Sequence, residues 1–223
     1  MTVGTPRIHY RAVDSTNARA RKLAERGAPH GTLVTAGRQT AGKGRQGRSW
    51  VAPAGRALLC SVVVRDPPML LPLAAGIAVA EEAGPNAQLK WPNDVLIGGR
   101  KVAGILVEGR PQHGWAVVGI GLNVAVDERD LPPELRERAA GLGRSPSEIE
   151  PTLSRLLAGL ERWIAAPSET VLAALRARDA LFGRHVQWQG GEGEAAGVDE
   201  HGRLVVAVNG DQVALNAGEV HLG

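Results

Sequence analysis

The segment that most constrains this chain is a basic, glycine-rich stretch at positions 37–50, GRQTAGKGRQGRSW. Glycine lets a backbone turn through positive φ and brings N–H groups close to a ligand, while arginine offers a planar donor fork for phosphate or carboxylate. The stretch therefore predicts an anion-binding loop, with a solvated linker or a nucleic-acid contact as alternatives. Its glycines, cations and closing aromatic are Gly37, Gly42, Gly44, Gly47, Arg38, Lys43, Arg45, Arg48 and Trp50.

The same segment fits most of the phosphate-binding pattern G-x-x-x-x-G-K-[ST], from Gly37 to Lys43. The next residue is Gly44, which has no hydroxyl to offer a magnesium ion. Further glycines and Pro53 also stand where that motif requires a helix. We therefore reject a P-loop nucleotidase and expect a flexible loop that closes on its ligand.

Composition narrows the class of protein. The 223 residues include 26 basic and 23 acidic side chains, a net charge of +3, so the basicity is local rather than a broad nucleic-acid surface. The single cysteine, Cys60, lies in the apolar run ALLCSVVV, which predicts a buried strand and no disulfide or Cys-rich metal site. No apolar run approaches the ~20 residues of a membrane span, and no signal region is visible, so we expect a cytoplasmic protein without membrane contact.

Apolar periodicity predicts a mixed order of elements. We expect strands over 7–13, 32–36, 57–65 and 115–123, and helices over 18–26, 70–83, 147–164 and 168–178. Gly98-Gly99 predicts a hairpin, with the polar motif KWPND before its first strand and Lys101 at the start of its second. We expect a short helix within 125–146, and after residue 181 turn signals predict a small all-β module of roughly five strands.

Two polar features allow two interpretations each. The run Asp14, Ser15, Thr16, Asn17 either caps a helix or points hydroxyls and an amide into a pocket. Lys101 is either a solvated strand end or a functional cation. The later motif GIGLN is not a dinucleotide fingerprint, because the third glycine is absent and no helix follows.

Four stretches together resemble bacterial biotin protein ligases: DSTN (14–17), QTAGKGRQGRSW (39–50), KWPND with KVAGILVE (90–94 and 101–108), and GIGLN (119–123). The resemblance covers essentially the whole chain. It implies an α+β fold, in which helices flank a mixed, mostly antiparallel central sheet as in class II synthetases and lipoate ligases. It also implies a catalytic biotin- and ATP-binding domain over 1–178 and an SH3-like β-barrel over 179–223.

The resemblance implies a two-step ligation. Biotin and ATP would give biotinyl-5′-AMP and pyrophosphate, and a lysine of a carboxylase's biotin carboxyl carrier protein would then attack the adenylate. Because a carboxylate has to approach a polyphosphate, such an enzyme needs fixed positive charge where charge builds up. On the matching positions the catalytic residues would be Lys101, Arg45 and Arg48, with Lys101 bridging the biotin carboxyl and the α-phosphate.

The resemblance also implies ligand contacts. The neutral ureido ring of biotin calls for matched polar side chains and little charge. The implied biotin contacts are Ser15, Thr16, Asn17, Gln39, Gly42, Lys43, Gly44, Arg45, Lys101 and Gly104. The implied ATP or adenylate contacts are Arg45, Arg48, Trp50 (stacked on adenine), Asn93, Lys101 and Asn123. Asp94 would hold Mg²⁺, the one cofactor expected beside the substrates.

This chain departs from the family pattern at two places. Where the family commonly reads G-R-G-R-x-G-R, Lys43 keeps the charge of the first arginine but loses its bidentate fork. Only 13 residues precede Asp14, too few for the helix-turn-helix domain of repressor relatives. We therefore expect a monofunctional ligase that binds no nucleic acid.

Two rival functions make distinct demands. A lipoate or octanoate ligase or transferase would need a long apolar channel and, for the transferase, a catalytic cysteine, for which Cys60 is poorly placed. A nucleic-acid-binding module would need a continuous basic face with several exposed aromatics, whereas aromatic residues make up 3% of the chain. No G-x-S-x-G elbow supports a serine triad. A monomer and a homodimer both remain open, as does the base for the transfer step.

Overall fold

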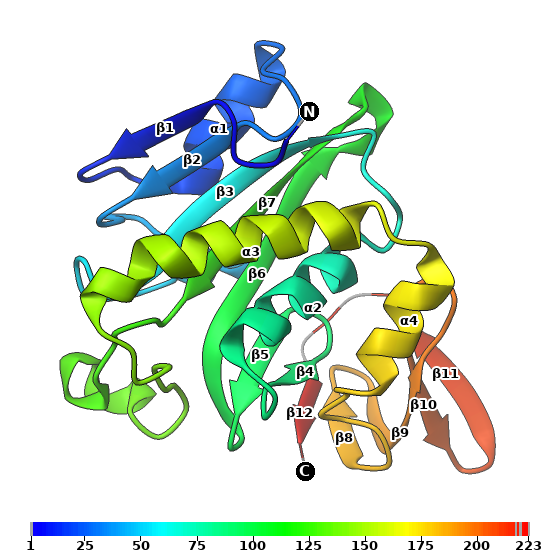
Figure 1. The fold of residues 1–223 in the computed structure, drawn as a ribbon. Helices are drawn as coiled ribbons and strands as arrows, with labels where there is room; N and C mark the ends of the chain where they lie inside the picture. The colour runs from blue at the N-terminus through cyan, green and yellow to red at the C-terminus, as the bar shows by residue number, and fades with distance from the viewer. Residues whose placement is uncertain (1, 217, 219, 223) are drawn as a thin grey trace.

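The computed structural model describes residues 2–216, 218 and 220–222, which form two β-sheets (Figure 1). The larger sheet has seven strands in the order β1-β2-β3-β7-β6-β5-β4, with β1 and β2 parallel and the other neighbours antiparallel. The smaller sheet has five antiparallel strands in the order β11-β10-β9-β8-β12. The predicted α+β fold with a mostly antiparallel central sheet is confirmed.

The bounds of the elements follow the apolar periodicity closely. The strands of the large sheet are β1 (Arg7–Tyr10), β2 (Leu33–Ala36), β3 (Leu58–Arg65), β4 (Gln88–Lys90), β5 (Asp94–Ile97), β6 (Arg100–Arg110) and β7 (Trp115–Leu122). The helices are α1 (Thr16–Glu25), α2 (Leu71–Ala83), α3 (Ile149–Ile164) and α4 (Ser168–Arg176). The strands of the small sheet are β8 (His185–Trp188), β9 (Gly191–Val198), β10 (Leu204–Val208), β11 (Asp211–Leu215) and β12 (Val220–Leu222).

Two expectations needed correction. The strand expected over 7–13 ends at Tyr10, and β4 was not predicted at all. The short helix expected within 125–146 takes the form of two 3₁₀ helices, Glu128–Asp130 and Pro133–Leu135, and a third, Pro146–Glu148, begins where the connection ends. Paired prolines at 132 and 133 remove the N–H donors that a longer helix would need there.

The helices cover both faces of the large sheet. Alternate residues of β3 point to opposite sides, so Cys60 and Val62 join the cluster beneath α2 and α3, while Val63 packs against Ala20 and Ala24 of α1. Figure 1 shows α3 lying across α2 in front of the sheet. The sheet is therefore buried on its α2 side, and α1 covers part of the opposite face.

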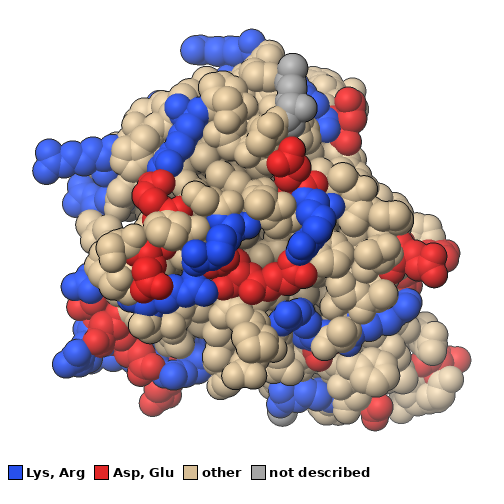
Figure 2. All heavy atoms as spheres, in the orientation of Figure 1, with Lys and Arg blue, Asp and Glu red and all other residues tan. Residues whose placement is uncertain are grey.

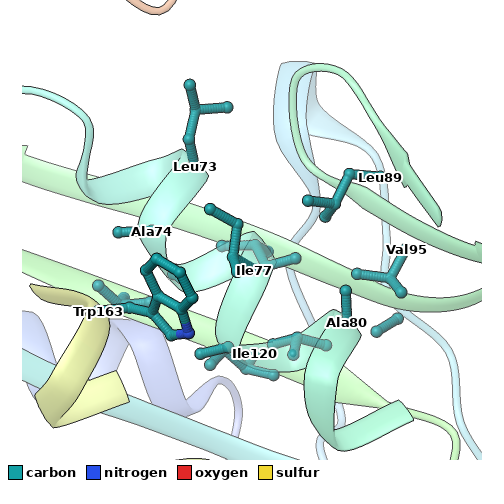
Figure 3. Packing of buried hydrophobic residues seen from close by; sticks show 14 of the residues in the cluster. Leu73, Ala74, Ile77, Ala80, Leu89, Val95, Ile120 and Trp163 are labelled. Atoms are coloured by element: carbon teal, nitrogen blue, oxygen red, sulfur yellow. The ribbon is translucent and has the colours of Figure 1, made fainter. Parts of the chain in front are cut away.

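The main core forms around α2, whose residues 73–80 are all buried. Ile77 and Ala80 face the strand residues Leu89, Val95 and Ile120, and Trp163 of α3 closes the cluster (Figure 3). The many alanines of α2 let its backbone approach the sheet, which explains why a helix so rich in small residues is a core element.

The segment that leads into the small sheet, and the turn between β9 and β10, are joined to the large sheet by hydrogen bonds near the KWPND motif. Leu89 N donates to Arg178 O at 2.8 Å and Ala180 N donates to Leu89 O at 2.9 Å. Trp91 Nε1 donates to Gly202 O at 3.0 Å. These bonds fix the small sheet beside the end of β4. None of the helices among the described residues has the length and apolar character of a membrane span.

Candidate active site

A cavity of about 670 Å³ lies where the start of α1, the segment 37–50 and the ends of β5, β6 and β7 meet. Its lining includes every predicted ligand contact except Gly42, which is buried within segment 37–50. The structure thus brings together Ser15, Thr16, Asn17, Gln39, Lys43, Gly44, Arg45, Arg48, Trp50, Asn93, Asp94, Lys101, Gly104 and Asn123. Residues that are far apart in sequence converge on one site.

One side of the cavity is lined by the buried Ser15, Thr16 and Asn17 and the half-buried Gln39. Together with Ser61, a buried residue outside the lining that is hydrogen-bonded to Thr16 and Asn17, we call them the polar wall. Gln39 Oε1 accepts from Thr16 N at 2.7 Å and lies 3.0 Å from Thr16 Oγ1. Ser61 Oγ lies 2.8 Å from Thr16 Oγ1 and 2.6 Å from Asn17 Oδ1. The wall is therefore uncharged and internally bonded, as the recognition of a neutral polar ring requires.

The DSTN motif both caps a helix and lines the cavity. Ser15 is the N-cap of α1 and its Oγ accepts from Ala18 N at 3.4 Å, yet Ser15 also lines the cavity. Asn17 is committed internally, because Nδ2 donates to Leu106 O at 3.2 Å and to Glu108 Oε2 at 2.9 Å. Asn17 therefore organises the wall more than it offers free donors to a ligand.

The two glycines of GIGLN make room for side chains that lie on the sheet. A Cβ at Gly119 would lie 2.0 Å from Asn17 Oδ1, and a Cβ at Gly121 would lie 2.3 Å from Trp50 Cε2. Gly104, which pairs with Gly121 across β6 and β7, would place a Cβ 3.0 Å from Trp50 Cζ3. Gly119 thus leaves space for the Asn17 amide, and Gly121 and Gly104 leave space for the Trp50 indole.

Segment 37–50, the glycine-rich loop, folds back on itself. Trp50 N donates to Gly42 O at 2.9 Å, and Gly44 N donates to Arg48 O at 2.7 Å. A Cβ at Gly42 would lie 2.4 Å from Trp50 O, so this position requires glycine. At the tip, Gln46 has φ 55°, a left-handed conformation that is uncommon outside glycine.

The cationic side of the cavity is formed by this loop and β6. Lys101 Nζ lies 2.6 Å from Asp94 Oδ1 and 5.6 Å from the ring centroid of Trp50. Arg45 donates from Nη1 to Asn93 Oδ1 at 3.3 Å, whereas the exposed Arg48 and Lys43 line the rim. This position supports the interpretation of Lys101 as a functional cation, because its ammonium lies near the Trp50 ring and Asp94 in the cavity and does not extend into solvent as at a solvated strand end.

Three buried polar atoms in the cavity lining have no hydrogen bond among the described residues: Trp50 Nε1, Asp94 Oδ1 and Asn123 Oδ1. Asp94 Oδ1 has the Lys101 ammonium as its ion-pair partner, which leaves the Trp50 donor and the Asn123 acceptor. The other half of the Asn123 amide donates to Ala140 O at 3.0 Å. A buried polar group without a hydrogen bond costs about 1–3 kcal/mol. A ligand that supplies an acceptor and a donor here would recover that free energy.

Several lining or supporting residues were missed from the sequence. Ser61 interrupts the apolar run ALLCSVVV and was passed over, although a lone hydroxyl in a buried strand needs a partner. Glu108 lies inside the motif KVAGILVE, and its Oε1 is 3.3 Å from Arg21 Nη1. The connection around Leu131, Leu135, Glu137, Arg138 and Ala139, and His221 and Leu222 of β12, also line the cavity without any motif.

The connection between β7 and α3 is hydrogen-bonded to the backbone of Lys101. Lys101 N donates to Arg138 O at 2.8 Å, and Ala140 N donates to Lys101 O at 2.9 Å. Farther along, Arg144 is fixed to α2 and α3 through Glu82 O at 2.7 Å and Thr152 Oγ1 at 2.9 Å. The segment that borders the cationic side is therefore anchored over residues 138–144.

Two observations bear on the rival functions. Cys60 is fully buried on the α2 side of β3, and burial raises the pKa of its thiol to about 12, so it stays a neutral thiol at physiological pH. On the face drawn in Figure 2, Lys and Arg side chains are interspersed with Asp and Glu over the described surface. Neither a cysteine nucleophile nor a continuous basic stripe is favoured.

A magnesium site was predicted at Asp94. Among the described residues no group of three or more His, Cys, Asp or Glu side chains is placed to hold a metal ion. Mg²⁺ commonly binds through one or two carboxylates together with substrate phosphates and water. The single carboxylate of Asp94 in the cavity fits an ion that arrives with a nucleotide, and does not fit a resident metal.

Comparison with known families matches residues 10–125 to the biotin/lipoate A/B protein ligase family and residues 181–223 to the biotin protein ligase C-terminal domain. The biotin–[acetyl-CoA-carboxylase] ligase of Mycobacterium tuberculosis is 38% identical over 229 residues, covering 92% of this chain and 85% of that protein. The bifunctional ligase/repressor BirA of Bacillus subtilis is 38% identical over 158 residues, covering 66% of this chain. This chain spans 49% of the length of that relative.

The fold also resembles a solved structure. The Aquifex aeolicus biotin protein ligase in complex with biotin and ATP superposes with a TM-score of 0.80 and 29% identity, covering 98% of this chain and 99% of that one. The catalytic-domain match includes the polar wall, the glycine-rich loop and Lys101, and the C-terminal match includes the small sheet. The chain belongs to the biotin/lipoate A/B protein ligase family and, by its C-terminal match, to the biotin protein ligases within it.

Proposed function

We propose that this protein is an ATP-dependent, AMP-forming biotin protein ligase. It activates biotin to biotinyl-5′-AMP with release of pyrophosphate, and then transfers biotin to a specific lysine of a carboxylase's biotin carboxyl carrier protein. The observation that carries the proposal is the division of one cavity into an uncharged polar wall and a cationic side. Biotin itself has this division, with a neutral ureido ring at one end and a carboxylate at the other.

The residues divide the work accordingly. The polar wall binds and orients the ureido ring, and the carboxylate then lies toward Lys101. Lys101 and Arg45 supply positive charge where a carboxylate oxygen attacks the α-phosphorus of ATP and pyrophosphate leaves. Arg48 lies at the rim, where it would contact the polyphosphate. Asn123 and Trp50 have the unpartnered acceptor and donor for the nucleotide side.

The ion pair between Lys101 and Asp94 is part of this proposal. Asp94 Oδ1 holds Lys101 Nζ in the cavity at 2.6 Å. Mg²⁺ bound with ATP would be held by Asp94 and would neutralise phosphate charge. Competition for Asp94 would then leave the Lys101 ammonium directed at the substrate.

The loop gives the reactive adenylate its protection. Closure of the glycine-rich loop would exclude water from the mixed anhydride, and opening would admit the acceptor lysine. We also propose that the protein is cytoplasmic and binds no nucleic acid, as expected from the sequence. The catalytic domain would span residues 1–178, and the small sheet would assist either docking of the carrier protein or binding of ATP.

The test is biotin- and ATP-dependent release of pyrophosphate, with lipoate and octanoate offered in parallel. We expect release with biotin alone, and Lys101→Ala to lower the rate by about 10²-fold or more, because a charge that stabilises the transition state is lost. Lys22→Ala, on α1 outside the cavity lining, is the matched control and should behave as the wild type. Pyrophosphate release supported equally by lipoate would show that biotin is not the specific substrate.

A further inference from the structure

The described lining of the cavity carries more positive than negative charge. It includes two carboxylates, Asp94 and Glu137, and six lysines and arginines: Lys43, Arg45, Arg48, Lys90, Lys101 and Arg138. This excess suits a triphosphate, but after pyrophosphate leaves much of the negative charge that offset it is gone. The second reactant of the proposed function is a lysine side chain, which is an ammonium at neutral pH because its pKa is about 10.4. The transfer step therefore brings a cation into a cationic cavity.

The two carboxylates differ in what they are already bound to. Asp94 is committed, because its Oδ1 lies 2.6 Å from Lys101 Nζ. Glu137 is exposed and lines the cavity, so it lies at the rim. Within the described parts of the chain Glu137 takes part in no ion pair and no side-chain hydrogen bond. Of the two carboxylates, Glu137 is therefore the one available to a cation that enters from solvent.

The backbone places Glu137 close to Lys101. Lys101 N donates to Arg138 O at 2.8 Å, so Glu137 directly precedes the residue whose carbonyl is anchored to β6. Arg138 N and Ala139 N both donate to Leu135 O, at 3.0 and 2.8 Å, which closes a turn around Glu137. The position of this residue relative to Lys101 is therefore set by folding.

The chemistry of transfer gives a carboxylate at this position a use. In the proposed function Lys101 lies at the biotin carboxyl group, so the acyl carbon of the adenylate lies near it. The lysine first loses one proton to water. Attack by the neutral amine then forms the C–N bond, breaks the acyl C–O bond and releases AMP, and the excess proton on nitrogen passes to water. Because nitrogen becomes positive again as it attacks, a nearby carboxylate stabilises that transition state.

We propose that Glu137 forms the subsite for the amine of the acceptor lysine, where it pairs with the ammonium at the rim and stabilises the positive charge that returns to nitrogen during attack. This rests on the proposed function and names where that site receives its second substrate. Adenylation joins two anions, biotin and ATP, and does not need Glu137. The inference thus separates the two steps by the residues that they use.

The test compares a primary amine with a thiolate as the attacking group. The full chain is loaded with biotin, ATP and Mg²⁺, freed from unbound ligands, and mixed at mildly alkaline pH with n-butylamine or β-mercaptoethanol. Butylamine has the four carbons and the amine of a lysine side chain. The thiolate attacks the same carbon, but its sulfur is never positive. AMP release and the biotinyl product are followed by mass spectrometry.

We expect Glu137→Gln to slow the butylamine reaction about tenfold, a moderate factor because an exposed charge is partly screened. The thiolate reaction should be unchanged or faster. Glu137→Asp, which keeps the charge, should retain most of the amine reaction, and Glu137→Lys should lose more of it than Glu137→Gln. Glu134→Gln is the matched control, since Glu134 is exposed on the same connection but outside the described lining. This control should behave as the wild type.

Two results would overturn the role of Glu137. One is equal slowing of the amine and thiolate reactions in Glu137→Gln, which a packing defect would produce. The other is a butylamine reaction that the substitution leaves unchanged, or that the wild type does not show at all. Pyrophosphate release should match the wild type in Glu137→Gln and Glu137→Asp. A wild-type chain that forms no adenylate and releases no pyrophosphate would instead refute the proposed function.

Discussion

The polar wall and the glycine-rich loop border the same cavity but are built in opposite ways. Apart from the half-buried Gln39, which the loop contributes, the wall is buried, and its side chains bond to each other and to the strands. The loop presents Lys43 and Arg48 at exposed positions, and its indole has a buried N–H without a described partner. The wall is therefore completed by folding, whereas the loop is completed by its ligand. Substitutions in the wall should affect affinity and stability together, and substitutions in the loop should affect turnover alone.

Gly119→Ala should have the largest effect of the wall substitutions. The new Cβ would lie 2.0 Å from Asn17 Oδ1, which is anchored and has no room to move. We expect a loss of about 1–3 kcal/mol in unfolding free energy, typical of overpacking, and at least roughly tenfold weaker biotin binding. Chemical denaturation and calorimetry measure the two.

Gly159→Ala provides the control for that change. On α3 a Cβ at this position would lie 3.6 Å from Ala78 Cβ, an ordinary contact. Alanine in a helix interior is better than glycine by about 0.5–1 kcal/mol, so this variant should be slightly more stable and bind biotin normally. A Gly119→Ala chain as stable and as active as this control would contradict a preformed wall.

Arg48→Ala tests the loop. Because Arg48 is an exposed loop residue and not part of the wall, biotin affinity without nucleotide should stay within about twofold of the wild type and the unfolding free energy within about 0.5 kcal/mol. Pyrophosphate release should fall by at least about tenfold, since a cation near the polyphosphate is lost. Arg129→Ala, an exposed arginine paired with Asp127 outside the cavity lining, is the control. If Arg48→Ala weakened biotin affinity as much as it lowered the rate of pyrophosphate release, the proposed difference between the polar wall and the glycine-rich loop would be wrong.

Gly121→Ala should have a smaller effect on stability than Gly119→Ala, although both glycines lie on β7. Its new Cβ would meet the Trp50 ring at 2.3 Å, but Trp50 belongs to the loop and can move aside. We expect an unfolding free energy within about 1 kcal/mol of the wild type and a weakened affinity for ATP. A stability loss as large as that of Gly119→Ala would show that the loop is as fixed as the wall.

Cys60 should have the smallest effect. Its pKa of about 12 keeps the thiol protonated at every pH below that value, so it should react slowly with thiol reagents at pH 8 in the folded chain. Cys60→Ala should retain pyrophosphate release and biotin transfer. Loss of transfer with adenylation intact would point to a cysteine-linked intermediate and revive the transferase alternative.

The sequence predicted the local features of the site better than the long-range ones. The capping run at Ser15, the loop glycines and the hairpin before Lys101 follow from neighbouring residues. Ser15, Gly44 and Gly99 from these features line the cavity. Ser61 depends on register instead, because it is opposite Gly119 only when β3 pairs with β7. A residue whose role is set by its strand partner has no motif of its own.

The same reason explains the missed segments. Several residues of the connection line the cavity because the backbone of Lys101 is hydrogen-bonded to Arg138 and Ala140. They are Leu131, Leu135, Glu137, Arg138 and Ala139. Leu222 reaches the cavity from the second sheet. Neither placement follows from apolar periodicity, since both depend on how separately folded units pack together.

The most direct test of the account is a single turnover without acceptor protein. The chain is mixed with biotin, ATP and Mg²⁺, freed from unbound ligand by rapid gel filtration, and its bound small molecules are identified by mass spectrometry. The account predicts biotinyl-5′-AMP in near one-to-one ratio with active protein and an equal amount of released pyrophosphate. Unchanged biotin and ATP, or an adenylate formed from lipoate or octanoate but not from biotin, would contradict it.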